Sequence, residues 1–248
     1  MAQDQQPRTE AVPALALDPR RLRAVFMDLV GRPPFDAERE RWSGSGLYEL
    51  LDELLPGEEV WRHWYEEQLY YFLRIDNFRP ETERTAAIPA DLAAGRLDVR
   101  EAIHLVALSS SFDARNPGAD TFVTVVMEQL DGIEVQKNAR ELEIGKRVYD
   151  GHEGLFLGST GSTQADVVRI AIEHERFGRT FLEREYRRLV RADPSRGELV
   201  RWARDFKKDP RVFRDLLRDW LASPAYEARL ADRRPQPNRL FVRALFVD

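Results

Sequence analysis

Cysteine is absent from this 248-residue sequence, and lysine is scarce. Without cysteine the chain can form no disulfide bond, no thiolate-ligated zinc site, no iron–sulfur cluster and no cysteine-attached haem, and it has no thiol nucleophile. The basic charge is therefore almost all arginine, whose flat guanidinium group favours forked ion pairs with carboxylates. The lysines are Lys137, Lys146, Lys207 and Lys208.

Long apolar runs are also missing. No stretch approaches the length that crosses a bilayer, and residues 1–13 lack the apolar segment of a signal peptide. A complete chain is therefore expected to be cytoplasmic, whereas a trimmed one would be periplasmic or extracellular. The net charge of −5 argues against a nucleic-acid partner, because phosphate binding needs a concentrated positive field. A composition of 43% hydrophobic and 33% charged residues is typical of a globular protein.

What the sequence does contain is one helical pattern that occurs four times. In residues 213–226, apolar side chains recur at i, i+3, i+4, i+7 and i+8, which places them on one side of an α-helix. Ser223 and Pro224 then favour the end of that helix and the start of another. The same spacing recurs in residues 47–60, 99–112 and 164–177. It predicts an all-α array of about four degenerate units of two to three helices, each burying its apolar face on its neighbour.

The pattern also predicts how the chain is divided. The segments are a flexible lead-in at 1–17, repeat units 1 and 2 at 18–132, an irregular glycine-rich insertion at 133–162, and repeat units 3 and 4 with the start of a further unit at 163–248. The β-branched run at 123–126 would suit a strand, but its parallel with residues 181–191 favours a helix. The aromatic residues of the helix expected at 60–75 are assigned to the core.

Two parts of the chain resemble known bacterial domains. Arg21-Leu-Arg-Ala-Val-Phe-Met-Asp-Leu-Val-Gly-Arg-Pro-Pro34, followed by residues 48–55 and 61–64, resembles a planctomycete-type domain of unknown function that often accompanies c-type cytochrome modules. Residues 181–230, with a restart at Phe241, resemble phycobilisome-linker-like repeat domains of unknown function in extracellular proteins. Together the resemblances cover about half of the chain. They imply a helical module for assembly or adhesion, often outside the cell, and carry over no catalytic residue. There is no CxxCH motif, so no haem and no other cofactor is expected.

Candidate chemistry is concentrated in residues 150–163, within the insertion. Asp150, His152 and Glu153 are metal-capable side chains at loop spacing. The following residues precede a helix whose N–H groups could attract a phosphate-like anion; they are Gly158, Ser159, Thr160, Gly161, Ser162 and Thr163. No lysine follows as in a phosphate-binding loop, and Thr163 with Asp166 also fits an ordinary capping pair. A site here requires a pocket in which the loop meets His174 or His63.

The other histidines are interpreted as structural. His174 takes the place of Ser109 and Ser223 in the repeat, which predicts a cap between helices, and His104 falls on the solvent-facing side of its helix. His63 aligns with positions that carry arginine in other copies. Histidines that ligate or catalyse need convergent partners, which the spacing does not show.

These observations favour a non-catalytic scaffold or protein-interaction module in a larger assembly, with a protein partner or a second copy. The expected interface is the apolar face of the further unit, formed by Leu240, Val242, Leu245 and Phe246. The alternative is a ligand- or metal-binding protein, with or without catalysis, whose site is the loop at 150–163. A third hypothesis, an electron-transfer accessory subunit, rests on the resemblance alone. No Ser–His–Asp order, HExxH or Gly-x-Ser-x-Gly motif occurs, so we lean against an enzyme.

Overall fold

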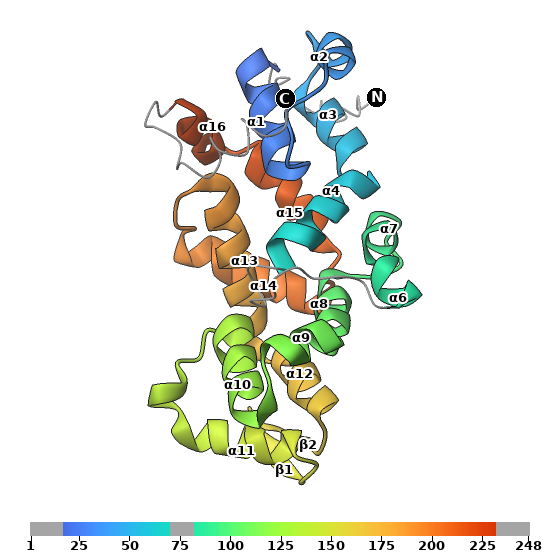
Figure 1. Cartoon of the computed structure of the whole chain (residues 1–248). Helices are drawn as coiled ribbons and strands as arrows, with labels where there is room; N and C mark the ends of the chain where they lie inside the picture. The colour runs from blue at the N-terminus through green and yellow to red at the C-terminus, as the bar shows by residue number, and fades with distance from the viewer. Residues whose placement is uncertain (1–16, 70–81, 232–248) are drawn as a thin grey trace, which may run out of the picture.

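The computed structural model describes residues 17–69 and 82–231, and in these ranges the chain is mostly helical with one two-stranded hairpin (Figure 1). The elements, in chain order, are α1 (Pro19–Leu29), α2 (Asp36–Trp42), α3 (Leu47–Leu54), α4 (Glu58–His63), the π-helical segment η1 (Trp64–Leu69), α6 (Glu83–Ala86), α7 (Ile88–Ala93), α8 (Val99–Ala107), α9 (Ser110–Arg115), α10 (Gly118–Val125), the π-helical segment η2 (Val126–Leu130), the 3₁₀ turn η3 (Val135–Lys137), α11 (Ala139–Tyr149), β1 (Gly154–Phe156), β2 (Ser159–Gly161), α12 (Gln164–Glu173), α13 (Glu175–Val190), α14 (Arg196–Lys208), α15 (Val212–Leu221) and α16 (Pro224–Ala231). The predicted helical class is confirmed. The lead-in to residue 16 and the interface predicted at Leu240, Val242, Leu245 and Phe246 lie outside the described residues.

The four stretches with the shared apolar spacing fold as helix pairs: α3 with α4, α8 with α9, α12 with α13, and α15 with α16. The apolar positions of α15 are all buried; they are Phe213, Leu216, Leu217, Trp220 and Leu221. Two serines cap the second helix of a pair as predicted, because Ser109 Oγ accepts the Phe112 N–H and Ser223 Oγ accepts the Tyr226 N–H, each at 3.2 Å. The helices are confirmed, whereas their arrangement as a repeat array stays a prediction.

The insertion at 133–162 is more ordered than an irregular loop. It holds η3, α11 and the antiparallel hairpin, in which Gly154 pairs with Gly161 and Phe156 pairs with Ser159. Phe156 is fully buried, and Gly145 on α11 makes room for it, since a Cβ at Gly145 would overlap Phe156 and Val123. The run at 123–126 is helical, as its parallel with 181–191 predicted.

An aromatic core runs through the centre of the molecule. Trp61 and Trp64 meet Phe213 with ring centroids 6.4 Å apart in both cases, and Phe181 lies 4.9 Å from Phe213. Trp220 stacks edge-on against neighbouring rings of α13 and α14. The described aromatic residues of the 60–75 helix are therefore core, as the sequence predicted.

Helix α13 joins the two ends of the fold. It packs on α14, α15 and α16 toward one end and on α12 and η2 toward the other, where the hairpin lies (Figure 1). Helices α1 and α16, which come from opposite ends of the described chain, lie side by side. Described helices of the predicted segments 18–132 and 163–248 therefore pack against each other, as α1 does with α16 and α8 does with α12.

Candidate functional site

The metal-capable residues of the insertion do not converge. Asp150, His152 and Glu153 are all exposed. Within the part of the chain that the structure describes, no group of three or more histidine or acidic side chains is placed to hold a metal ion. The metal site suggested by the sequence stays a prediction without supporting geometry.

The glycine- and serine-rich stretch at 158–163 forms β2 and the cap of α12. Asp166 occupies the start of this helix, since its carboxylate accepts the Ser162 N–H at 3.0 Å and the Thr163 hydroxyl at 2.8 Å, while its own N–H donates to Thr163 Oγ1 at 3.1 Å. The Ser162 bond, with help from Arg169, lowers the pKa of Asp166 to about 2. The capping pair is confirmed, and the protein's own carboxylate lies where a bound anion was envisaged.

A second cluster ties the first described helix to the last. The carboxylate of Asp28 on α1 accepts the Tyr226 hydroxyl at 2.7 Å and both terminal nitrogens of Arg229, at 2.7 and 3.1 Å. Burial, followed by the charge of Asp28, raises the pKa of Tyr226 well above its ordinary value. The sequence analysis did not indicate Asp28 as a partner of Tyr226 or Arg229, which lie 198 and 201 residues away along the chain. This geometry favours a structural role, because two parallel hydrogen bonds between a guanidinium and a carboxylate fix the relative position of the helices that carry them.

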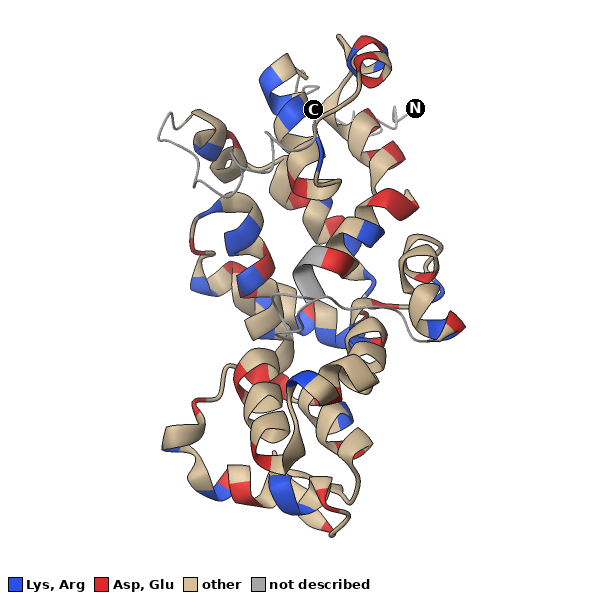
Figure 2. Ribbon diagram, in the orientation of Figure 1, with Lys and Arg blue, Asp and Glu red and all other residues tan. Residues whose placement is uncertain are grey.

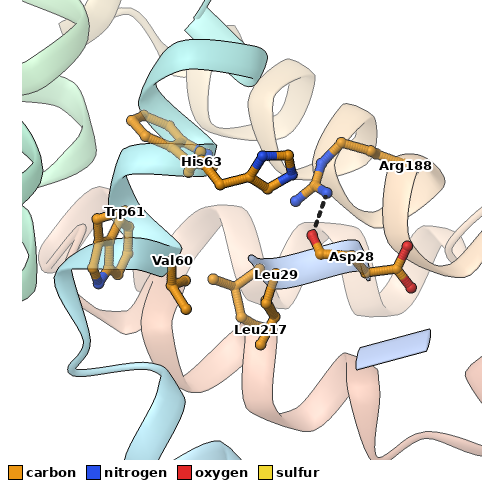
Figure 3. A pocket seen from close by; sticks show the side chains of 8 residues that line it. Asp28, Leu29, Val60, Trp61, His63, Arg188 and Leu217 are labelled. Atoms are coloured by element: carbon orange, nitrogen blue, oxygen red, sulfur yellow. Dashed lines mark hydrogen bonds between the residues drawn. The ribbon is translucent and has the colours of Figure 1, made fainter. Parts of the chain in front are cut away.

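A small cavity lies beside this cluster (Figure 3). The His63 ring and the Arg188 guanidinium lie near each other, with Leu29 and Leu217 beneath them, while the carboxylate of Asp28 points away. Arg188 donates to the backbone oxygen of Asp28 at 3.2 Å. The cavity volume of about 10 Å³ is that of a single water molecule, which is too small for a substrate. Its lining includes His63 but no residue of the loop at 150–163.

His174 forms a buried pair that the sequence did not indicate. It stands at the start of α13, as predicted, but its side chain makes no capping bond. Instead Nδ1 lies 3.1 Å from Oδ1 of the fully buried Asp131, and this hydrogen bond raises the pKa of His174. Burial raises the pKa of Asp131, and the contact with His174 partly opposes that rise. His174 therefore has the position of a cap but not the predicted side-chain bond. Its imidazole is instead bonded to the carboxylate of Asp131, which follows η2.

A larger concave site, a surface groove of about 400 Å³, lies between α6, α8 and α12. Its lining combines charged residues with an apolar floor; they are Arg84, Leu97, Asp98, Arg100, Glu101, His104, Leu105, Arg169, Ile172 and Glu173. This volume falls within the range of small-ligand sites. The placement of His104 on a wet surface needs correction, since the ring is half-buried here and burial lowers its pKa.

No family model, no curated protein and no solved structure matches this chain. The resemblances to phycobilisome-linker-like repeats and to the planctomycete-type domain therefore stay hypotheses. Among the helices that the structure describes, none combines the length and the apolar character needed to cross a membrane.

Proposed function

We propose that this protein is a non-catalytic helical interaction module that works with a protein partner or a second copy in a larger assembly. The observation that carries the proposal is Phe35, an aromatic side chain that is 62% exposed at the end of the molecule where α1, α2 and α3 lie (Figure 1). Aromatic residues, phenylalanine included, and arginine are enriched at protein–protein interfaces relative to the rest of the surface.

Both the backbone and the ring of Phe35 have contacts that favour one orientation of the side chain. It follows Pro33 and Pro34, and its N–H donates to Glu38 at 2.7 Å. The guanidinium of Arg32 lies 4.0 Å from the Phe35 ring centroid. Two carboxylates fix that guanidinium, because Glu38 accepts from it at 2.7 and 2.8 Å and Glu59 at 2.6 and 3.0 Å. A side chain that is already ordered loses little entropy on binding, which favours affinity.

The surrounding surface suits a selective contact. Acidic and basic residues both occur on the helices at this end of the molecule (Figure 2). Mixed charge around an exposed apolar anchor provides orientation and discourages wrong partners.

Native mass spectrometry of the protein purified gently from its own source tests the proposal. We expect the wild type to carry the mass of a multimer or of a bound second protein, and Phe35→Ser to reduce that species strongly with unchanged far-UV circular dichroism. Leu155→Ser is the matched control, since Leu155 is 61% exposed in the hairpin at the opposite end. If Phe35→Ser leaves the abundance of the assembly unchanged, Phe35 is not part of its interface. A wild-type protein that is a bare monomer at all concentrations would contradict the interaction function.

A further inference from the structure

The groove between α6, α8 and α12 is lined by three arginines and three carboxylates, but these groups are not all paired with one another. Its acidic groups are already used: Asp98 Oδ1 accepts the N–H groups of Arg100 and Glu101, at 2.8 and 3.0 Å, and Glu101 returns a bond to the Asp98 N–H at 2.7 Å. Glu173 is paired with Arg169 at 3.1 Å. Each carboxylate of the lining therefore already has a partner, and none of these partners is Arg84.

Two arginines at the groove retain donors. The guanidinium of Arg100 reaches Asp98 only at 4.0 Å, which is too long for a hydrogen bond. Arg84 on α6 makes no hydrogen bond or ion pair with another residue that the structure describes. An exposed guanidinium next to a concave apolar floor is suited to a carboxylate, which it can hold through two parallel hydrogen bonds.

His104 lies in the lining of the groove, and the charges around it affect its pKa. The backbone of Ala165 on α12 also acts on this ring, and it partly opposes the lowering of the His104 pKa. Burial is the main cause of its lowered pKa, and the positive charges of Arg84 and Arg169 add to it against the opposing charge of Glu173. Of the charges that act on this ring, those of Arg84 and Arg169 would attract an anion and that of Glu173 would repel it.

We propose that this groove binds a small organic acid, whose carboxylate pairs with Arg84 beside His104 and whose apolar part lies on Leu97, Leu105 and Ile172. A site of about 400 Å³ holds a ligand of that kind. The apolar floor contributes by burying hydrocarbon, and the guanidinium fixes the orientation. This groove does not include Phe35, so a test of acid binding here is independent of the proposed interaction function.

Binding of the acid is linked to protonation of His104. The charged groups facing the ring are Arg84 from α6, Asp98, Arg100 and Glu101 from α8 and its cap, and Arg169 and Glu173 from α12. His104 is the histidine of this lining, and histidine is the side chain whose charge ordinarily changes between about pH 5 and 8. A bound carboxylate favours the imidazolium, so affinity rises as the pH falls through the His104 pKa.

Side-chain NMR of the histidines provides the test, because the chain has four of them. We expect sodium hexanoate to shift the His104 signals saturably and to raise the His104 pKa, while exposed His152 stays unchanged. Arg84→Gln should weaken binding by about tenfold, the effect of losing ~1.4 kcal/mol. Arg201→Gln, an exposed arginine on α14, is the control and should bind as the wild type does.

Further probes separate the parts of the proposal. Hexylamine, which has the same chain and the opposite charge, should leave His104 unchanged, and acetate should bind more weakly than hexanoate. The proposal is overturned if His104 does not respond to hexanoate, if Arg84→Gln binds as well as Arg201→Gln, or if acetate and hexanoate bind equally. Equal shifts at His104 and His152 would show nonspecific association and would also overturn it.

Discussion

Asp131 shows how much a single buried carboxylate depends on one partner. Its side chain is fully inaccessible to solvent, His174 bonds to Oδ1, and Oδ2 has no hydrogen-bond partner among the described residues. A charge in such a place is costly unless an opposite charge faces it. Protonated His174 supplies that charge, which is why the hydrogen bond with Asp131 raises the histidine pKa.

We predict that Asp131→Asn lowers the pKa of His174 and changes how stability depends on pH. In the wild type, the His174 contribution is complete below the unfolded pKa of about 6.5 and is lost as the pH rises through the higher folded pKa. The free energy of unfolding should therefore fall with rising pH in that window, and this decline should disappear in Asp131→Asn. NMR titration and urea unfolding at about pH 6, 7 and 8 measure the two effects.

His104 gives an internal check on the sign of this effect. Because its pKa is lowered, its neutral form stabilises the fold above pH 6.5, and this contribution is lost as the pH falls through the folded pKa. The effect of Asp131→Asn on the pH dependence of the unfolding free energy must therefore appear above pH 6.5. An unchanged His174 pKa in the variant would show that the pair is not its cause. His152→Gln, at an exposed position, is the matched control.

At the scale of an element, the C-terminal end of α1 depends on a glycine. The N–H groups of Val30 and Gly31 both bond to the Phe26 carbonyl, at 2.7 and 3.0 Å. Gly31 has a φ of +80°, a left-handed conformation that side chains with a Cβ disfavour. It also lies against the His63 ring, which a Cβ would overlap.

We predict that Gly31→Ala destabilises the protein much more than Gly44→Ala. Gly44 has nearly the same φ, +82°, but no atom lies within 4 Å of a Cβ built there. Gly44→Ala should therefore cost only the backbone strain of about 1–2 kcal/mol. Gly31→Ala should lose a further ~1–3 kcal/mol because α4 and the His63 ring must move. Urea unfolding of both variants measures the difference in their free energies of unfolding. Equal destabilisation would show that the His63 ring moves aside at no measurable cost.

At the scale of the whole molecule, α13 and the buried pairs join the two ends of the fold. Arg184 on α13 donates to the Gln129 carbonyl of η2 at 3.0 Å, and the pair of Asp131 with His174 lies close by in the chain. At the other end, Arg229 and Asp28 fasten α16 to α1. Contacts of this kind favour one cooperative unit, although the sequence suggested successive segments.

We predict that the protein unfolds in a single transition. All five tryptophans lie outside residues 65–201, so their fluorescence reports on the part of the fold that excludes α8 to α12 and the hairpin. Far-UV circular dichroism reports on the helices of both parts. The two urea transitions should coincide, as they do for a two-state domain. Separate midpoints would show that the region from α8 to α12 unfolds independently of the remainder.

The helices and several of their ends could be predicted from the order of residues along the chain. Apolar residues at i, i+3 and i+4 predict a buried helical face because these positions are neighbours on one side of any α-helix. The caps at Ser109, Thr163 and Ser223 were predictable for the same reason, since each bond spans three residues. These interactions are local, so the order of residues is enough to specify them.

The tertiary structure alone decided which polar groups meet. Asp28 with Arg229 joins residues 201 apart, and Asp131 with His174 joins residues 43 apart. His104 lines a groove and is not simply solvent-facing, because α6 and α12 pack against its helix. The packing of the helices determines which of these polar residues become partners. In a chain with 33% charged residues, many acidic and basic residues could pair, and their spacing along the sequence does not show which of them do.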